Sequence, residues 1–325
     1  MYSISTVLKD FIRRVYYFSY DILDFKGREI LKRNISLSDK YRGERAFILG
    51  TGESLNTIDI TMLKDEFTLG TNLIFLHDEI KHIDLNMFVL LDNYRNTLPQ
   101  WPENHVGPNG YDGKEQIYKE IDEKLIDTTT LILPRENYKC INNVIRDKTK
   151  IFIKVRKNLN LNNGLPNKIV ADFTKRKICG MSSIYSSIMV LIYLGFKEIY
   201  LCGQGYTYNP EYVFHFYDNI IFSKNIGKKE AIHSIKNAIE IRKEKGGTVE
   251  YYGLLEKGDY FRSICIRRKN ENNPQHYIYH RKIKKYADSQ GVKIINIVPE
   301  GFESPVYEKM GWGKVVRNVL PNKLS

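Results

Sequence analysis

The chain lacks any apolar run long enough to cross a membrane. No stretch of its 325 residues approaches the roughly 20 consecutive apolar residues that a spanning helix needs. The N-terminus also lacks a compact apolar stretch followed by a small-residue cleavage site, so we expect no export signal. These two absences predict a cytoplasmic protein.

Cysteine is scarce as well. The chain has four cysteines, which lie far apart and form no C-x-x-C pair. This spacing argues against a disulfide framework and against a zinc ribbon. It fits reduced thiols in the cytoplasm.

Positive charge predominates over negative charge. The chain has 50 lysines and arginines against 38 aspartates and glutamates, which gives a formal net charge of +12. Such a charge favours an anionic partner: nucleic acid, a membrane surface or a phosphorylated substrate. The positive residues are spread along the chain without a long basic block or an RNA-binding aromatic signature. We therefore expect no nucleic-acid partner.

The first 41 residues form a distinct basic segment. Its apolar residues recur at helical spacing: Leu8, Phe11, Ile12, Val15, Phe18 and Ile22. Positive charges lie nearby: Lys9, Arg13, Arg14, Lys32 and Arg33. A basic amphipathic helix can lie on an anionic membrane, which predicts a peripheral position on the inner face of the cytoplasmic membrane. A helix packed on the protein's own core is the alternative, and the sequence leaves both open.

From Arg45 onward, short apolar runs alternate with helical segments. The runs span residues 46–50, 87–92, 130–134, 150–155, 198–203, 249–253 and 293–299. Runs of β-prone residues without strict alternation fit strands that are covered on both faces. Between two of them, a buried helix is predicted to begin near Ser182 and Ser183 and to end at Gly195. Strands that alternate with helices predict an α/β fold with a largely parallel sheet.

Two glycines directly follow the first run. Gly50 and Gly52 would let the backbone approach a ligand closely, and the following turn can aim amide groups at an anion. The third glycine of the dinucleotide-binding fingerprint is absent, so a purely structural turn is the alternative. Asn72, Asp92 and Asn93 follow the ends of later runs. Such residues collect at the carboxyl edge of a parallel sheet, where ligands bind.

Three blocks of the sequence share one resemblance. Residues 48–76 contain a Gly-x-Gly-x-Ser-Leu turn, an Ile-Asp pair and the asparagine that ends the sequence LGTN. Residues 182–203 contain a serine-rich helix followed by Gly-Phe-Lys-Glu-Ile-Tyr-Leu-Cys-Gly, and residues 276–280 read His-Tyr-Ile-Tyr-His. In this order, the blocks resemble those of the bacterial sialyltransferases of glycosyltransferase family 42. Residues 194–204 also resemble motility-associated-factor and pterin-pyrophosphokinase-like proteins.

This resemblance implies a Rossmann-like, GT-A-variant fold with a small lid subdomain. We therefore expect a nucleotide-sugar-binding core at 42–205, a lid or acceptor segment at 206–280, and a helix and strand at 281–325 that complete the core. The implied reaction moves sialic acid from its cytidine-monophosphate (CMP) ester, with inversion and without a metal or other cofactor. The implied acceptor is a glycan of a surface polysaccharide or lipooligosaccharide. Homo-oligomerisation stays open.

The resemblance also implies roles for individual residues. Those that would bind the donor are Gly50, Thr51, Gly52, Ser54, Asn72, Asp92, Asn93, Ser182, Ser183 and Gly203. The two serines would hold the donor's carboxylate. Tyr206 and Tyr212 would contact the leaving phosphate, and His280 would be the general base. His215, which lies beside the tyrosines in the sequence, is the competing candidate for the base.

These roles are chemically reasonable. Loss of CMP builds negative charge on the phosphate, which tyrosine hydroxyls can stabilise without a cation. The acceptor hydroxyl must lose a proton, and histidine's ordinary pKa of about 6.5 suits a base. A zinc site at His276 and His280 would need a third ligand, and the chain has no Asp-x-Asp pair after a predicted strand. We expect no metal, and we interpret His276 as part of the scaffold or lid.

Two other classes of function stay open. A nucleotide-dependent pyrophosphokinase of the pterin type would need ATP, magnesium and more carboxylates near the glycine turn than Glu53 and Asp92 provide. A non-catalytic basic binding module would need no ordered nucleotide pocket. If the protein is a transferase of this kind, one difference from the family concerns the donor: Gly180 stands where the family has an arginine ahead of the serine-rich helix. A related CMP-activated acidic sugar therefore stays open as the donor.

Overall fold

The computed structural model describes most of the predicted core. The described residues are 24–91, 113–156, 171–174, 178–179, 183–204, 249–251, 264–266, 274–299 and 304–320, together with Ile12 and Val15. Within them, eight strands form one sheet in which every pair of neighbours is parallel. The prediction of an α/β fold with a parallel sheet is confirmed.

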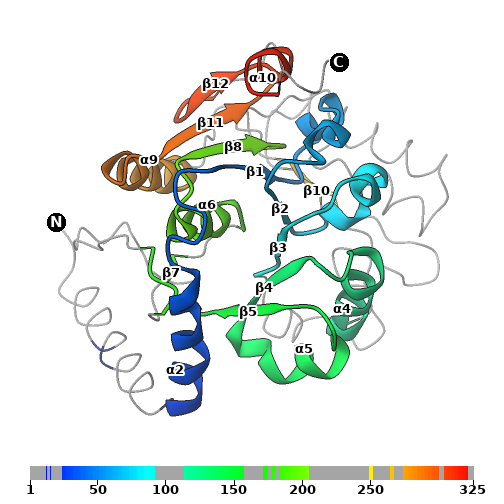
Figure 1. The fold of residues 1–325 in the computed structure, drawn as a ribbon, viewed down its shortest axis with the longest axis vertical. Helices are drawn as coiled ribbons and strands as arrows, with labels where there is room; N and C mark the ends of the chain where they lie inside the picture. The colour runs from blue at the N-terminus through cyan, green and yellow to red at the C-terminus, as the bar shows by residue number, and fades with distance from the viewer. Residues whose placement is uncertain are drawn as a thin grey trace.

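The sheet has the strand order β12-β11-β8-β1-β2-β3-β4-β5 (Figure 1). Its strands are β1 (Arg45–Leu49), β2 (Thr68–Thr71), β3 (Met87–Val89), β4 (Thr130–Pro134), β5 (Lys150–Ile153), β8 (Glu198–Cys202), β11 (Lys293–Ile297) and β12 (Glu308–Met310). From β1 the chain builds one side of the sheet through β5, then returns beside β1 with β8 and builds the other side. The carboxyl ends of β1 and β8 therefore mark the switch point at which ligands bind in open α/β sheets.

Two small strand pairs lie outside this sheet. β6 (Val155–Arg156) and β7 (Ile178–Cys179) pair in parallel, whereas β9 (Val249–Tyr251) and β10 (Ile264–Ile266) pair antiparallel. The run at 249–253 thus forms a strand, as predicted, but it does not join the main sheet.

Helices cover both faces of the sheet (Figure 1). One face carries α6 (Ser183–Leu194) and α9 (Pro274–Ser289); the other carries α4 (Gly113–Lys124), α5 (Tyr138–Val144) and α10 (Trp312–Asn318). The connections after β1 and β2 are 3-10 turns: η2 (Glu53–Thr57), η3 (Ile60–Leu63), η4 (Ile74–Leu76) and η5 (Asp78–His82). Another 3-10 turn, η6 (Arg135–Asn137), links β4 to α5.

The apolar runs are continuous because each strand buries both of its faces. In β1, Phe47 and Leu49 pack into the layer of α4 and α5, whereas Ala46 and Ile48 pack into the layer of α6 and α9. Helix α6 is also buried on nearly all sides, since every one of its residues except Tyr193 is buried. Its predicted end is confirmed: Gly195 has a φ of +96°, a conformation that favours glycine.

The segment before β1 packs on the edge of the sheet. Helix α2 (Phe25–Lys32) and η1 (Arg33–Leu37) lie against β5 (Figure 1), and Leu31 is fully buried. Asn34 Nδ2 donates hydrogen bonds to Phe152 O in β5 and to Phe173 O, each at 3.0 Å. For residues 24–41, the structure therefore agrees with the alternative in which the N-terminal segment packs on the protein's own core. Ile12 and Val15 are helical and exposed.

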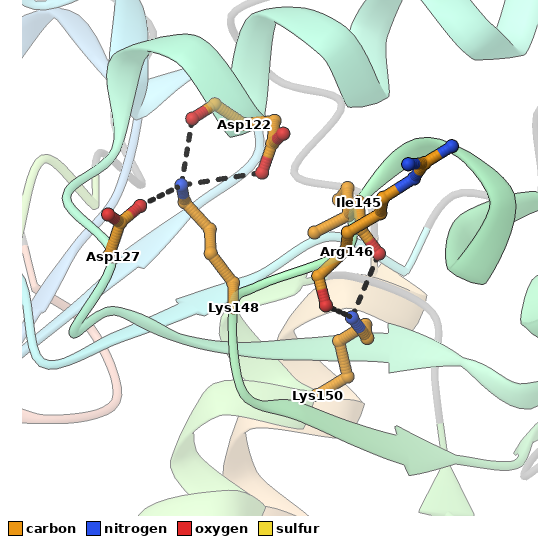
Figure 2. Close-up of polar contacts among 6 residues, drawn as sticks. All are labelled: Asp122, Asp127, Ile145, Arg146, Lys148 and Lys150. Carbon is orange, nitrogen blue, oxygen red and sulfur yellow. Dashed lines mark hydrogen bonds and ion pairs between the residues drawn. The ribbon is translucent and has the colours of Figure 1, made fainter.

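A buried lysine forms an ion cluster with two more exposed aspartates at the amino-terminal edge of the sheet (Figure 2). Lys148 has a side chain that is 2% exposed, and its Nζ contacts Asp122 O at 2.8 Å, Asp127 Oδ1 at 3.1 Å and Asp122 Oδ1 at 3.4 Å. Beside it, Lys150 Nζ donates to Ile145 O at 2.9 Å, near the end of α5. A lysine suits that position because the carbonyls at a helix C-terminus lack partners within the helix. This cluster lies at the opposite end of the strands from the switch point.

Candidate functional site

The switch point is built from glycines that contact each other. A Cβ on Gly50 would lie 2.8 Å from Gly203 O, and a Cβ on Gly203 would lie 2.9 Å from Gly50 O. Gly203 also has a φ of +70°. Both glycines were predicted to bind the donor, and the structure gives them a structural role as well: without side chains, β1 and β8 can leave the sheet in contact.

The amides of this turn are occupied by protein carbonyls. Gly50 N donates to Cys202 O at 2.7 Å, and Gly52 N donates to Gly203 O at 2.8 Å. These two N–H groups therefore bind the end of β8, and an anion would have to be held by other amides of the turn. The turn leads into the 3-10 helix η2, so no α-helix dipole stands behind it.

Two predicted side chains are buried in the turn. Thr51 and Ser54 are 7% and 2% exposed. Among the residues that the structure describes, none pairs with Ser54 Oγ. A buried hydroxyl without a partner costs about 1–3 kcal/mol, so a water or ligand atom is its expected partner.

Asn72 and Ser183 are brought together from distant parts of the sequence. Ser183 is the first residue of α6, and its Oγ donates to Asn72 Oδ1 at 2.5 Å. Asn72 directly follows β2 and has a φ of +53°, while its backbone N–H donates to Val89 O at 3.1 Å. A left-handed asparagine is uncommon, and such conformations concentrate at functional sites. The structure thus joins the first and second blocks at the carboxyl edge of the sheet.

His280 joins the third block to the second. Its side chain lies in the layer between α9 and the sheet and is fully buried. The imidazole makes a T-shaped contact with the ring of Tyr185, in the first turn of α6, at a centroid distance of 4.5 Å. On another side, it contacts the ring of Tyr307 at 5.3 Å, and its Nδ1 lies 2.8 Å from the Tyr307 hydroxyl.

Asn296 is a polar residue that sequence reasoning missed. It lies within β11 and is fully buried, and its Nδ2 donates to Gln204 O at 3.2 Å and to Ser304 Oγ at 3.3 Å. Gln204 is the second residue after β8, so Asn296 binds the chain where it leaves the switch point. An asparagine within the apolar run KIINIVP was the available signal, because asparagine is depleted in strands and seldom fully buried.

Cys202, the last residue of β8, is a neutral thiol in this site. It is completely buried, and burial raises the pKa of its thiol above the ordinary value. A raised pKa disfavours the thiolate, which is the nucleophilic form. Cys202 therefore serves packing beside the glycine contact.

Several predicted residues fall outside the described part of the chain. They are Asp92, Asn93, Ser182, Tyr206, Tyr212 and the alternative base His215. His276 lies in α9, but its side chain is not described. Within the described residues, no group of three or more histidine, cysteine, aspartate or glutamate side chains is arranged to hold a metal ion. The described helices also include none that is long and apolar enough to span a bilayer.

Comparison with known proteins gives structural similarity only. No protein-family model and no curated protein matches the chain. Among solved structures, the MAf glycosyltransferase from Magnetospirillum magneticum AMB-1 is similar at a TM-score of 0.39 and 14% identity, over 89% of this chain. The sialyltransferase CstII from Campylobacter jejuni, in complex with cytidine-5'-monophosphate, is similar at a TM-score of 0.37 and 12% identity, over 82% of this chain and 85% of that chain.

CstII in complex with CMP-3FNeuAc is also similar, at a TM-score of 0.29 and 15% identity, over 71% of this chain and 87% of that chain. The chain spans 38% of the length of the MAf glycosyltransferase. The residues that the structure describes form an α/β fold around a sheet of eight parallel strands. The similar solved structures are glycosyltransferases.

Proposed function

We propose that the protein is an inverting, metal-independent glycosyltransferase. It moves sialic acid, or a related acidic nine-carbon sugar, from its CMP ester to a glycan acceptor. One observation carries the proposal: three sequence blocks that resemble sialyltransferase motifs, and that lie far apart along the chain, are in contact at the carboxyl side of the sheet. Ser183 donates a hydrogen bond to Asn72, the ring of Tyr185 packs on His280, and Gly50 contacts Gly203.

The donor would bind across the switch point. Ser183 begins a helix of 12 residues whose N-terminus carries partial positive charge, which favours the donor's carboxylate. Asn72 is held in three ways: by its left-handed backbone, by the hydrogen bond from its backbone N–H to Val89 O and by its contact with Ser183. A polar group held in this way binds with little loss of conformational entropy. Ser54 would supply the buried hydroxyl whose partner is a ligand atom or a water.

The chemistry would need a base and a stabiliser of the leaving phosphate. We assign the base to His280 and the stabilising hydroxyls to Tyr206 and Tyr212. In the described structure His280 is fully buried, with Tyr185 and Tyr307 against it. Because the imidazole is buried in this way, the proposal requires a second, open state of the site in which the acceptor can reach Nε2. Closure of this kind keeps water away from a reactive sugar cation.

The N-terminal segment would bring the enzyme to its acceptor. Helix α2 and η1 bury Ile30, Leu31 and Asn34, whereas Phe25 and Ile35 are 66% and 71% exposed. The exposed side also carries positive residues: Lys26, Lys32 and Arg33. Exposed apolar side chains beside basic ones suit the surface of an anionic membrane. We therefore propose peripheral membrane association and a lipid-linked glycan acceptor of surface polysaccharide or lipooligosaccharide.

The test is a transfer assay with the purified full chain. CMP-sialic acid is incubated with a panel of galactosides, with and without EDTA, and CMP release and the glycoside product are measured. We expect acceptor-dependent CMP release that EDTA leaves unchanged. A parallel assay with ATP, magnesium and a hydroxymethylpterin tests the pyrophosphokinase alternative. Product formation only in the second assay, or binding of CMP that depends on magnesium, would contradict the proposal.

Binding of CMP gives a second, independent readout. Calorimetric titration of the wild type with CMP should give the same affinity with and without magnesium, because no metal is assigned to the site. Replacement of both Phe25 and Ile35 by serine should reduce sedimentation with anionic vesicles and leave CMP affinity unchanged. Unchanged sedimentation would remove these two side chains from the account of membrane association.

A further inference from the structure

A series of buried and partly buried polar contacts, which passes through the backbone and side chain of Tyr307, leads from the end of β8 to His280. Asn296 Nδ2 donates to Gln204 O at 3.2 Å and to Ser304 Oγ at 3.3 Å. Ser304 Oγ donates to Tyr307 O at 2.8 Å, and the Tyr307 hydroxyl lies 2.8 Å from His280 Nδ1. Tyr307 and Asn296 lie outside the three sequence blocks. Their contacts end on the residue that the proposed function makes the base.

The directions of the first contacts are fixed by chemistry. Gln204 O is a carbonyl and can only accept, so the amide of Asn296 must turn its Nδ2 toward it. Ser304 directs its hydroxyl hydrogen at Tyr307 O, which leaves the Ser304 oxygen to accept from Asn296. The backbone of Tyr307 is thereby tied to the point where the chain leaves β8.

The ring contacts fix the plane of the imidazole but not its proton. Tyr185 lies at an interplanar angle of 70° to His280, and Tyr307 at 82°. These edge contacts hold the ring in place whichever nitrogen carries hydrogen. What the ring contacts leave open is the tautomer. If Nε2 is to act as the base, the tautomer is set by the hydrogen-bond partner of the other ring nitrogen, Nδ1. For Nδ1, that partner is the hydroxyl of Tyr307.

We propose that Tyr307 is a positioning residue for His280. Its hydroxyl accepts the hydrogen of Nδ1–H and holds the imidazole in the tautomer whose Nε2 has a free electron pair for a proton. The inference rests on the proposed function, in which His280 is the general base.

The proposed transfer requires this tautomer. The acceptor oxygen forms a bond to the anomeric carbon, and the bond from that carbon to the phosphate oxygen breaks, with its electron pair leaving on CMP. The acceptor's proton moves to Nε2 of His280. The hydrogen on Nδ1 stays on that nitrogen and keeps its hydrogen bond to the Tyr307 oxygen, which stabilises the imidazolium that forms. In the opposite tautomer, Nε2 already carries hydrogen and cannot take the proton.

The direct test is nuclear magnetic resonance of the full chain labelled with ¹⁵N at histidine. At a pH above histidine's ordinary pKa of about 6.5, two-bond proton–nitrogen correlations distinguish the Nδ1–H from the Nε2–H form. The His280 signals are identified by their loss in a His280→Gln variant. We expect the Nδ1–H form in the wild type and a shift toward Nε2–H in Tyr307→Phe, which keeps the ring contacts and removes only the hydroxyl. An Nε2–H form in the wild type would overturn the inference.

The kinetic test separates positioning from stability. In the transfer assay, Tyr307→Phe should lower kcat about tenfold or more and leave the donor KM nearly unchanged, since the hydroxyl acts on the base. Tyr193→Phe is the matched control: it also removes a tyrosine hydroxyl from a partly buried hydrogen bond, the one to Asn34 O at 2.9 Å, but at the other end of α6 from the Tyr185–His280 contact. Equal effects of the two variants on kcat would contradict the inference.

The two tests also separate this inference from the proposed function. If the chain transfers no sugar but His280 shows the Nδ1–H form that depends on Tyr307, the tautomer assignment is supported and the function is wrong. If the chain transfers sugar and Tyr307→Phe changes neither the tautomer nor kcat, the function is supported and the role of Tyr307 is wrong.

Discussion

Replacement of Gly50 by alanine tests whether contact between β1 and β8 shapes the site. The new Cβ would lie 2.8 Å from Gly203 O and 3.0 Å from Cys202 O, whereas ordinary contact begins at 3.4 Å. Both obstacles are backbone atoms, and the hydrogen bonds from the Gly50 and Gly52 amides hold them in place. The ends of the two strands must therefore separate by roughly half an ångström, at a cost of about 1–3 kcal/mol.

The assay is thermal unfolding followed by circular dichroism, together with calorimetric titration of CMP. We expect Gly50→Ala to lower Tm by several degrees, since about 1 kcal/mol shifts Tm of a large domain by about 2–4 °C. CMP affinity should fall as well, because the separated strand ends frame the proposed pocket.

Gly313→Ala in α10 is the matched control. A Cβ at that position meets nothing within 4 Å, and alanine is favoured over glycine within a helix by up to about 1 kcal/mol. This variant should keep or raise Tm and leave CMP affinity unchanged. If Gly50→Ala unfolds at the same temperature as the wild type, the packing argument is wrong.

Four further predictions concern single residues. His280→Gln should reduce transfer turnover about 10²–10⁴-fold and leave CMP affinity unchanged, because the base acts in the chemical step. Ser183→Ala removes the partner of Asn72 Oδ1 and should weaken CMP-sugar binding about tenfold by calorimetry. Lys148→Met should lower the free energy of unfolding by about 1–2 kcal/mol in urea titrations, a small value because Asp127 is largely exposed. Asp24→Asn should weaken the acid dependence of Tm.

The sign of the last prediction follows from the pKa of Asp24. Burial raises this pKa, but hydrogen bonds from the Gly27 N–H and the Arg135 side chain and the nearby positive charges outweigh it, so the pKa lies below its ordinary 3.8. A folded-state pKa below the unfolded one contributes stability above about pH 3.8, which is lost as pH falls through the folded value. The variant should therefore lose less Tm than the wild type on acidification below pH 4.

The first three of these predictions have the following contradicting outcomes. Near-normal turnover of His280→Gln would show that His280 is not the base. Unchanged donor affinity of Ser183→Ala would show that the contact between Ser183 and Asn72 does not contribute to donor binding. Lys148→Met is checked against Lys284→Met, whose exposed pair with Asp288 should contribute almost nothing. A Lys148→Met protein as stable as that control would show that the amino-terminal cluster is not stabilising.

The sheet could be predicted because burial on both faces is visible in the sequence. Strands such as β1 direct alternate residues, Phe47 and Ile48, into two different apolar layers, so the run is continuous. Strand β12 could not be found in this way. It is a partly exposed edge strand, and its residues Glu308–Met310 show no apolar run. Strand β2 (Thr68–Thr71) was also absent from the predicted runs, since it is short and contains a glycine and two threonines.

The candidate site could be predicted as a set of residue types but not as a set of contacts. The position of Asn72 after a strand indicated the carboxyl edge, but its bond to Ser183 joins residues that are 111 positions apart. A glycine is required at position 50 because carbonyl groups at the end of β8 leave no room for a Cβ, and the sequence around Gly50 does not reveal that contact. Asn296 was overlooked because its neighbours in β11 are apolar, and only the sheet shows which carbonyl its amide binds.

The packing of the N-terminal segment on β5 has a consequence for solubility. A strand at the end of a sheet can pair with another chain and start aggregation. Asn34 occupies the carbonyl of Phe152 in that strand, and α2 lies along it. A protein shortened to begin near Tyr41 would expose this strand, so self-association, rather than loss of membrane contact alone, is the expected result of that truncation.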